Sequence, residues 1–303
     1  ADPLLRQVLP LEAELDEVPG YGPDPLAEAD ARRAPGLLQK YAGRALLITT
    51  EACAIHCRYC FRREFPYDEH ASDAGRWSAA IAQLAADPTV EEVILSGGDP
   101  LSLSDARLEQ LATALEALPH LRSLRLHTRQ PIVLPSRVDE GLMQWLRVRK
   151  LPLVMVLHAN HPQEIDAQVA GALQRLRAGG ALLLNQSVLL RGVNDDAATL
   201  EALMRTFVEL RIKPYYLHHG DLAPGTAHLR TTIAEGQALM RALRGRFSGL
   251  CLPEYVLDLP GGHGKSPVGP SYLAWKSDGA AAIEDFNGNS HAYPESPAGS
   301  RAD

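Results

Sequence analysis

Short apolar runs alternate with longer amphipathic stretches along most of this chain. The first run, Ala45 to Thr50, is rich in leucine and β-branched residues and predicts a buried strand. Runs of this kind predict six strands, at residues 45–50, 91–96, 122–127, 152–157, 181–189 and 213–217. Helical periodicity predicts the intervening segments, at roughly residues 72–86, 104–118, 138–149, 163–178, 196–211 and 231–246.

The predicted helix at residues 104–118 shows the helical periodicity well. Leu108, Leu111 and Leu115 recur at helical spacing, Ser104 is a suitable N-cap, and Pro119 ends the pattern. Strands that alternate with helices of this length predict βα units and a parallel sheet. Six units fall short of a closed eight-stranded barrel, so an open partial barrel and a doubly wound sheet are the two candidate folds.

Each predicted strand runs into an unusual polar segment. Ligand sites collect at the carboxyl ends of parallel strands, so these segments are expected on one rim. After the first strand, which leads into a cysteine-rich loop, the segments are Ser96-Gly97-Gly98-Asp99, His127-Thr128-Arg129, His158-Ala159-Asn160-His161, Asn185-Gln186-Ser187 and His218-His219-Gly220-Asp221.

Three of the four cysteines stand close together, as Cys53, Cys57 and Cys60, with the spacing C-x3-C-x2-C. Thiolates select iron–sulfur clusters, zinc or copper(I). A [4Fe–4S] cluster normally takes four cysteines, so three would leave one iron open for a small molecule. Structural zinc would need a further ligand such as His56 or His127, and a disulfide or chance cluster is the remaining alternative. The spacing favours the cluster.

The segment from Leu46 to Arg63 resembles the cluster loop of radical S-adenosylmethionine enzymes, and in particular the lysine 2,3-aminomutases. In such enzymes the open iron of a [4Fe–4S] cluster binds S-adenosylmethionine, and reductive cleavage gives a 5′-deoxyadenosyl radical. The resemblance covers roughly residues 35–290. It implies an α/β fold, a partial (β/α)6 barrel with N- and C-terminal extensions, and an external electron donor such as flavodoxin or ferredoxin.

The same resemblance implies three segments along the chain. Residues 1–44 would form an N-terminal segment with contacts to a cofactor phosphate, and residues 45–250 the barrel core. Residues 251–303 would form a C-terminal segment that carries a cofactor lysine and ends in a disordered, Gly-, Ser- and Pro-rich tail.

Contacts with S-adenosylmethionine are expected from two of the polar segments. Ser96, Gly97, Gly98 and Asp99 could form a tight turn that needs glycine, or bring the backbone close to a ligand. They resemble the motif that meets the amino group of S-adenosylmethionine. Gln186 alternates with its neighbour along a strand, and the resemblance places it toward the cofactors.

A glycine-rich segment near the C-terminus ends in Lys265. It lacks the frame of a nucleotide-binding P-loop, and Pro260 and Pro267 argue against a long helix after it. A lysine on such a segment can form a Schiff base with an aldehyde cofactor. It resembles the segment that holds pyridoxal 5′-phosphate in the aminomutases, with His263 at a position where the best-known members have glycine.

A short basic segment precedes the first predicted strand. Lys40, Tyr41 and Arg44 could be a solvated turn or an anion site. In the aminomutases, a matching segment contacts the phosphate of pyridoxal 5′-phosphate.

Three further residues are implied to bind substrate. Arg62 would hold the α-carboxylate, a task that suits a guanidinium group. Asp221 and Asp258 match the acidic positions that bind the distant ammonium of lysine, although a surface carboxylate is the commoner fate of any aspartate. Of His218 and His219, at most one can face the cavity, because neighbours on a strand point to opposite sides.

Composition and net charge argue against some classes of binding partner. A net charge of −7 disfavours non-specific binding to nucleic acid, and the sequence lacks an apolar run of 18 residues that would span a membrane. No signal peptide is expected at the N-terminus. Cysteines gathered in one ligand cluster fit a reducing cytoplasm, and the remaining Cys251 is expected to be buried and inert. Homo-oligomerisation is left open.

These observations and the resemblance together predict an isomerase, a radical S-adenosylmethionine and pyridoxal 5′-phosphate-dependent enzyme that interconverts L-lysine and β-lysine. One alternative keeps the chemistry but dedicates β-lysine to the modification of elongation factor P, a branch that residues 1–67 resemble. Another is an aminomutase for a different amino acid. A non-catalytic iron–sulfur or zinc module is the alternative from another class, and it leaves Asp221, Asp258 and Lys265 unexplained.

Overall fold

The structure is a computed structural model that describes residues 2–67, 74–276 and 280–293. Its centre is a mixed ten-stranded sheet in which the strands lie side by side in chain order. The ten strands are β1 (Arg32–Ala34), β2 (Leu37–Tyr41), β3 (Arg44–Thr50), β4 (Glu92–Gly97), β5 (Ser123–Thr128), β6 (Leu153–Leu157), β7 (Leu182–Val188), β8 (Lys213–His218), β9 (Glu254–Leu259) and β10 (Gly264–Pro267).

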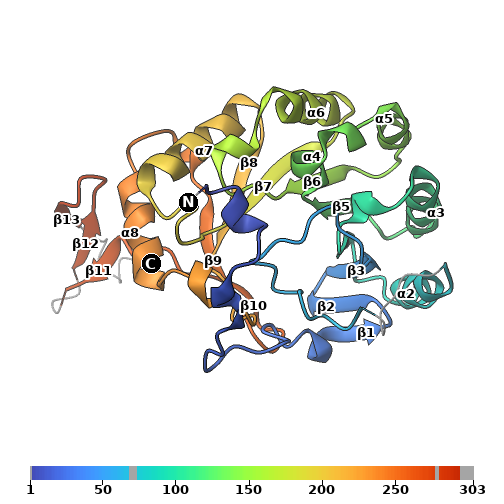
Figure 1. Cartoon of the computed structure of the whole chain (residues 1–303), viewed down its shortest axis with the longest axis horizontal. Coiled ribbons are helices and arrows are strands. Elements are labelled where there is room, and N and C mark those ends of the chain that lie inside the picture. Colours follow the sequence, from blue (N-terminus) through green and yellow to red (C-terminus); the bar gives the residue numbers. More distant parts are fainter. Residues whose placement is uncertain (1, 68–73, 277–279, 294–303) are drawn as a thin grey trace, which may run out of the picture.

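Seven neighbouring strands, β3 to β9, run parallel to one another. The connections contain the helices α2 (Ala74–Ala86), α3 (Asp105–Glu116), α4 (Gln130–Val133), α5 (Glu140–Arg147), α6 (Ala167–Ala178), α7 (Ala197–Glu209) and α8 (Ile233–Leu243). The predicted strands and helices are confirmed with small shifts at their ends, and Ser104 caps α3. Helices α3, α5 and α6 lie along the outer side of the curved sheet (Figure 1).

The two ends of the large sheet are not joined by strand pairing in the described part of the chain. Among the residues that the structure describes, β1 and β10 are the outer strands and are not paired with each other. The fold is therefore an open α/β barrel rather than a closed one, as predicted. In the same part of the chain, no helix is long and apolar enough to cross a membrane.

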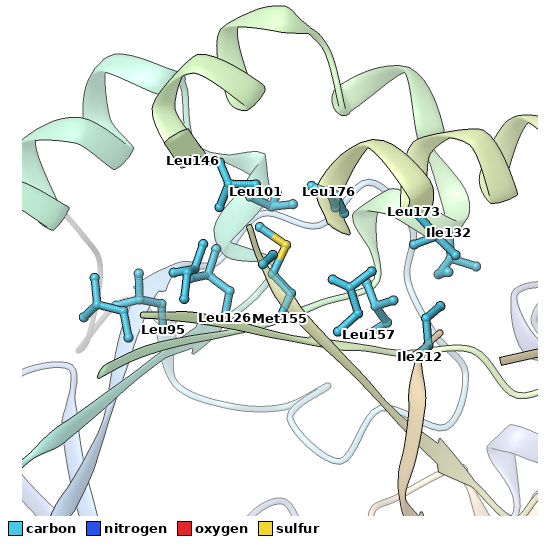
Figure 2. Close-up of a cluster of buried hydrophobic side chains, with 14 of the residues drawn as sticks. Leu95, Leu101, Leu126, Ile132, Leu146, Met155, Leu157, Leu173, Leu176 and Ile212 are labelled. Carbon is cyan, nitrogen blue, oxygen red and sulfur yellow. The ribbon is translucent and has the colours of Figure 1, made fainter. Parts of the chain in front are cut away.

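A buried apolar row binds the parallel strands to the outer helices. Strand register places one residue from each of five strands side by side. The row consists of Leu47, Leu95, Leu126, Met155 and Leu183. Figure 2 shows three of them beneath Leu146 of α5 and Leu176 of α6. Burial of each such side chain stabilises the folded state by roughly 1.5–3 kcal/mol relative to exposure. Packing against the helices therefore fixes the position of the sheet, whose opposite face points away from them.

The opposite face of the sheet is polar toward its carboxyl end. Side chains alternate between the two faces of a strand, so the neighbours of the apolar row point to the inside of the barrel. Ser96, Arg125, His127 and Gln186 lie on this inner face and line a cavity. The polar side chains predicted to gather on one rim therefore lie on the same side of the sheet.

Some elements were not predicted. Strands β1 and β2, β9 and β10, and a small separate sheet of β11 (Leu273–Trp275), β12 (Ala281–Glu284) and β13 (Ser290–Tyr293) are present. Several have only three or four residues, too few to show a periodic pattern. The division at residues 44 and 250 stays a prediction, while strands from all three segments share one sheet. Residues 294–303, at the tail predicted to be disordered, lie outside the described residues.

Candidate active site

A cavity of about 280 Å³ opens at the carboxyl ends of the parallel strands. It is lined by every residue that the sequence singled out for a cofactor or substrate. These residues are Lys40, Tyr41, Arg44, Cys53, Cys57, Cys60, Arg62, Ser96, Gly97, Gly98, Asp99, Gln186, Asp221, Asp258 and Lys265. The fold therefore brings the predicted site together, while the role of each residue stays a prediction.

The cysteine loop directly follows β3. Cys53, Cys57 and Cys60 all line the cavity, whereas Cys251 is buried in the hydrophobic core, as predicted. Burial, together with the neighbouring Cys57 thiol, raises the pKa of Cys60. Bound iron would supply the positive charge that a thiolate needs there. Three thiols on one loop, with the fourth elsewhere, fit a [4Fe–4S] cluster that keeps one iron free of protein ligands.

Gly97 and Gly98 pack directly against the chain that enters the cysteine loop. Gly97 has φ +121°, and a Cβ added at Gly98 would lie 2.4 Å from the carbonyl oxygen of Ala52. The Gly98 N–H donates to Thr50 O at 2.7 Å. Close backbone packing explains why glycine stands at these positions, and it couples the end of β4 to the cysteine loop.

Asp99 is buried and fully engaged with its own chain. Its carboxylate accepts hydrogen bonds from Thr128 Oγ1 at 2.7 Å and from the backbone N–H groups of Arg129 and Gln130 at 2.7 and 2.9 Å. It also caps the next turn through Leu101 N at 3.0 Å. Asp99 therefore ties the end of β4 to the end of β5, and its contact with S-adenosylmethionine stays a prediction.

Lys265 and Asp258 are cross-strand partners on β10 and β9. Lys265 Nζ lies 2.5 Å from Asp258 Oδ2. On the other side of the turn, the Lys265 backbone N–H donates to Tyr41 Oη at 2.6 Å. Gly264 has φ +78°, and a Cβ there would lie 2.6 Å from Tyr41 Oη. The Arg44 guanidinium stacks 3.8 Å from the centre of the Tyr41 ring. The predicted phosphate segment thus contacts the predicted cofactor lysine.

Arg62 has a partner that sequence reasoning missed. Its Nε and Nη2 donate to both carboxylate oxygens of Glu28 at 2.7 and 2.8 Å, and both side chains are buried. Lys40 Nζ lies 3.4 Å from the same carboxylate. Burial alone would raise the pKa of Glu28, but the charge and hydrogen bonds of Arg62 lower it overall. Arg62 Nη1 reaches Ser96 Oγ at 3.3 Å, so this edge of the guanidinium faces the cavity.

Three histidines that line the cavity are neutral at pH 7. Burial lowers the pKa of His158 to about 3, and it lowers those of His127 and His218 well below the ordinary value. The Gln186 amide lies 2.9 Å from His158 Nε2. His219, which follows β8, is buried and does not line the cavity, which confirms that at most one of the two neighbouring histidines faces it.

The two predicted substrate acids differ in their environment. Asp258 holds Lys265. Burial raises the pKa of Asp221 to about 7, and the nearby charge of Asp258 adds to the increase. Asp221 therefore needs a further cation nearby to be fully ionised at neutral pH. An acceptor of this kind suits an ammonium group.

Comparisons with known proteins agree with this geometry. Residues 47–141 match the model of the Radical SAM superfamily, and residues 240–301 match the model described as Lysine-2,3-aminomutase. L-lysine 2,3-aminomutase of Escherichia coli (strain K12) is 44% identical over 267 residues, which cover 88% of this chain and 78% of that protein. L-lysine 2,3-aminomutase of Clostridium subterminale is 38% identical over 295 residues, covering 97% and 71%.

A solved structure supports the fold. SuiB of Streptococcus suis, bound to the precursor peptide SuiA, matches with a TM-score of 0.50 and 16% identity, over 67% of this chain and 45% of that chain. The radical S-adenosylmethionine superfamily implies a [4Fe–4S] cluster and S-adenosylmethionine, which the three cavity thiols fit. The identities to curated relatives, over most of both chains, decide the family. The chain belongs to the lysine 2,3-aminomutase family of radical S-adenosylmethionine isomerases.

Proposed function

We propose that this protein interconverts L-lysine and β-lysine with the help of pyridoxal 5′-phosphate. The observation that carries the proposal is that the cysteine loop, the Lys265 turn and two acidic side chains line one cavity. When bound, S-adenosylmethionine on the cluster supplies a 5′-deoxyadenosyl radical, and pyridoxal 5′-phosphate supplies a carbonyl carbon for the migrating nitrogen.

Cys53, Cys57 and Cys60 would hold the cluster. The segment Ser96 to Asp99 and the Gln186 side chain line the same cavity as this loop and would contact S-adenosylmethionine. Their polar groups can meet its amino, carboxylate and ribose groups through hydrogen bonds.

Lys265 would hold pyridoxal 5′-phosphate through its amine. Tyr41 touches the Lys265 turn, and Lys40 and Arg44 line the cavity next to it. Two cations and a hydroxyl at this place suit a phosphate group. The contact between segments 224 residues apart supports a shared cofactor site.

Arg62, Asp221 and Asp258 would select lysine. Glu28 occupies Nε and Nη2 of Arg62, so Nη1, which contacts Ser96, is the nitrogen that would donate to a substrate carboxylate. Asp258 is engaged by Lys265 in this structure. When the Lys265 amine is bound to the cofactor, Asp258 becomes available to the ammonium of lysine. Two acids at this end of the cavity disfavour a substrate such as glutamate, because like charges repel.

Three further features complete the proposal. An external electron donor such as flavodoxin or ferredoxin would reduce the cluster, the enzyme would work in the cytoplasm, and copies of the chain could associate. The chain would divide into the three segments 1–44, 45–250 and 251–303, with phosphate contacts in the first and the cofactor lysine in the last.

The decisive experiment is anaerobic reconstitution with iron, sulfide, pyridoxal 5′-phosphate, S-adenosylmethionine and dithionite. L-lysine, L-glutamate and other amino acids would be supplied in separate reactions. β-Lysine and 5′-deoxyadenosine are expected with L-lysine. Isomerisation of another amino acid in its place would overturn the substrate, and the absence of 5′-deoxyadenosine with every substrate would favour a non-catalytic module.

Supply of β-lysine for the modification of elongation factor P is a second candidate. The segment Phe65-Pro66-Tyr67 resembles that branch, and the Tyr67 hydroxyl donates to Gly97 O at 3.0 Å beside the cavity. Chiral analysis of the β-lysine formed separates the two candidates.

A further inference from the structure

Arg129 is a buried arginine that none of the proposed roles uses. It follows β5 directly and is 7% exposed. Its backbone N–H donates to Asp99 Oδ2 at 2.7 Å, and Asp99 also binds Thr128. The backbone at Arg129 is therefore fixed against the end of β4, and the guanidinium extends from a rigid base.

The guanidinium contacts the cysteine loop on one side. Its Nη1 donates to Cys57 Sγ at 2.9 Å and also to the Tyr59 hydroxyl. The positive charge of Arg129 thus stands directly beside one of the three cavity thiols.

The other terminal nitrogen of the guanidinium, Nη2, is held by residues that lie outside the cysteine loop. Nη2 donates to Gln7 Oε1 at 3.0 Å and to Glu164 Oε2 at 2.8 Å. Gln7 is completely buried, and its own amide donates to Glu164 Oε1 at 3.2 Å. The backbone carbonyl of Gln7 also accepts a hydrogen bond from the backbone N–H of Arg58, in the cysteine loop, at 2.8 Å. These contacts orient the fork so that Nη1 faces Cys57.

We propose that Arg129 donates an N–H···S hydrogen bond to the cluster ligand Cys57 and thereby raises the reduction potential of the [4Fe–4S] cluster. The inference rests on the proposed function, in which Cys57 binds iron. When one electron from the external donor enters the cluster, the negative charge of the cluster increases by one, and no proton leaves Arg129. A hydrogen bond and a cation beside a ligand sulfur stabilise the more negative, reduced state. Arg129 acts through Cys57 and is therefore a positioning and tuning residue.

The experiment compares Arg129→Met with Arg125→Met in the full chain, reconstituted anaerobically with iron and sulfide. Arg125 lines the same cavity, four residues earlier in β5, but pairs with Glu92 rather than with a cysteine. The reduced cluster is followed by electron paramagnetic resonance during a redox titration. Arg129→Met is expected to lower the equilibrium constant for one-electron reduction about tenfold, or about 59 mV. Arg125→Met is expected to change it by less than about threefold.

Equal midpoint potentials in the parent and Arg129→Met, at equal iron content, would overturn the inference, as would an equal shift in Arg125→Met. If Arg129→Met does not fold, Arg129→Lys takes its place. It keeps the charge, but a single ammonium cannot contact Cys57, Gln7 and Glu164 together as the planar fork does. The potential is expected to fall here too, and an unchanged potential would overturn the inference. A parent protein that binds no iron would instead overturn the proposed function.

Discussion

Lys265 and Asp258 face each other across the antiparallel pair of β9 and β10, with Nζ 2.5 Å from Oδ2. The register of two short strands sets this contact, so it needs no rearrangement of the backbone. The amine proposed to bind the cofactor is therefore in direct contact with an acid proposed to bind the substrate. Lys265 can hold only one of the two partners at a time, because its single amine is either bonded to the cofactor or paired with Asp258.

Replacing Lys265 by alanine is expected to abolish the absorbance of protein-bound pyridoxal 5′-phosphate while the iron–sulfur absorbance stays. The reason is that the cysteine loop and the Lys265 turn are separate segments of the chain. Lys150 is exposed and does not line the cavity, so Lys150→Ala is the matched control and is expected to keep both bands. A cofactor band that persists in Lys265→Ala would remove the assignment of Lys265.

The ionisation of Asp221 is expected to appear in the pH dependence of catalysis. Its pKa is raised to about 7, so the free enzyme carries a protonated Asp221 between about pH 4 and pH 7 and an ionised one above. The ammonium of lysine needs the ionised form, and kcat/KM should therefore rise as the pH increases through about 7. In the same window the folded state binds more protons than the unfolded state, so stability falls as pH rises.

Asp221→Asn is expected to remove the step in kcat/KM near pH 7 and to lower its plateau roughly 10- to 100-fold, the loss typical of a hydrogen bond to a charged group. The pH profile of the variant with L-lysine checks this. A step of unchanged position and height in Asp221→Asn would assign the ionisation to another group.

Sequence reasoning predicted the parallel part of the fold because its signals are long and repeated. The apolar runs of β3 to β8 and helices such as α3 each extend over several residues of one periodicity. Strand alternation also predicted that at most one of His218 and His219 faces the cavity, and His218 is the one that lines it. The fifteen predicted site residues came from motifs along the chain and from the family resemblance, and the fold brings all of them to one cavity.

The missed features depend on contacts that one segment cannot encode. Glu28 begins a short 3-10 helix, and its bidentate pair with Arg62 joins residues 34 positions apart. Gln7 and Arg129 are 122 positions apart. Strand β10 has four residues, and its partner β9 defines it through cross-strand hydrogen bonds. Such pairs form only when the whole chain packs together, so the periodicity of a single segment does not predict them.

Glu28→Gln is expected to weaken the binding of L-lysine more than it slows turnover. Glu28 holds Arg62 by two charge-assisted hydrogen bonds, and glutamine offers only one acceptor oxygen for them. A less constrained Arg62 should raise KM about tenfold, with a smaller change in kcat. Glu28→Asp keeps the charge on a shorter side chain and should recover part of the effect. Equal losses in both variants would indicate that Glu28 acts through stability alone.

Gly98→Ala is expected to lower both the stability and the iron content of the reconstituted protein. The added Cβ would lie 2.4 Å from Ala52 O, and backbone at that distance must move. Overpacking of this kind costs about 1–3 kcal/mol, and here the displaced backbone leads into Cys53. The free energy of unfolding in urea and the iron bound per chain are the measurements.

Gly171→Ala is the matched control, because Gly171 lies within α6 and, apart from its chain neighbours and the backbone of its own helix, no described atom lies within 4 Å of an added Cβ. Alanine is the better helix former, so this variant is expected to gain about 0.5–1 kcal/mol in stability with unchanged iron content. The comparison separates the effect of a methyl group from the effect of its place. If Gly98→Ala bound iron as fully as Gly171→Ala, close packing between the end of β4 and the cysteine loop would not be what shapes the cluster site.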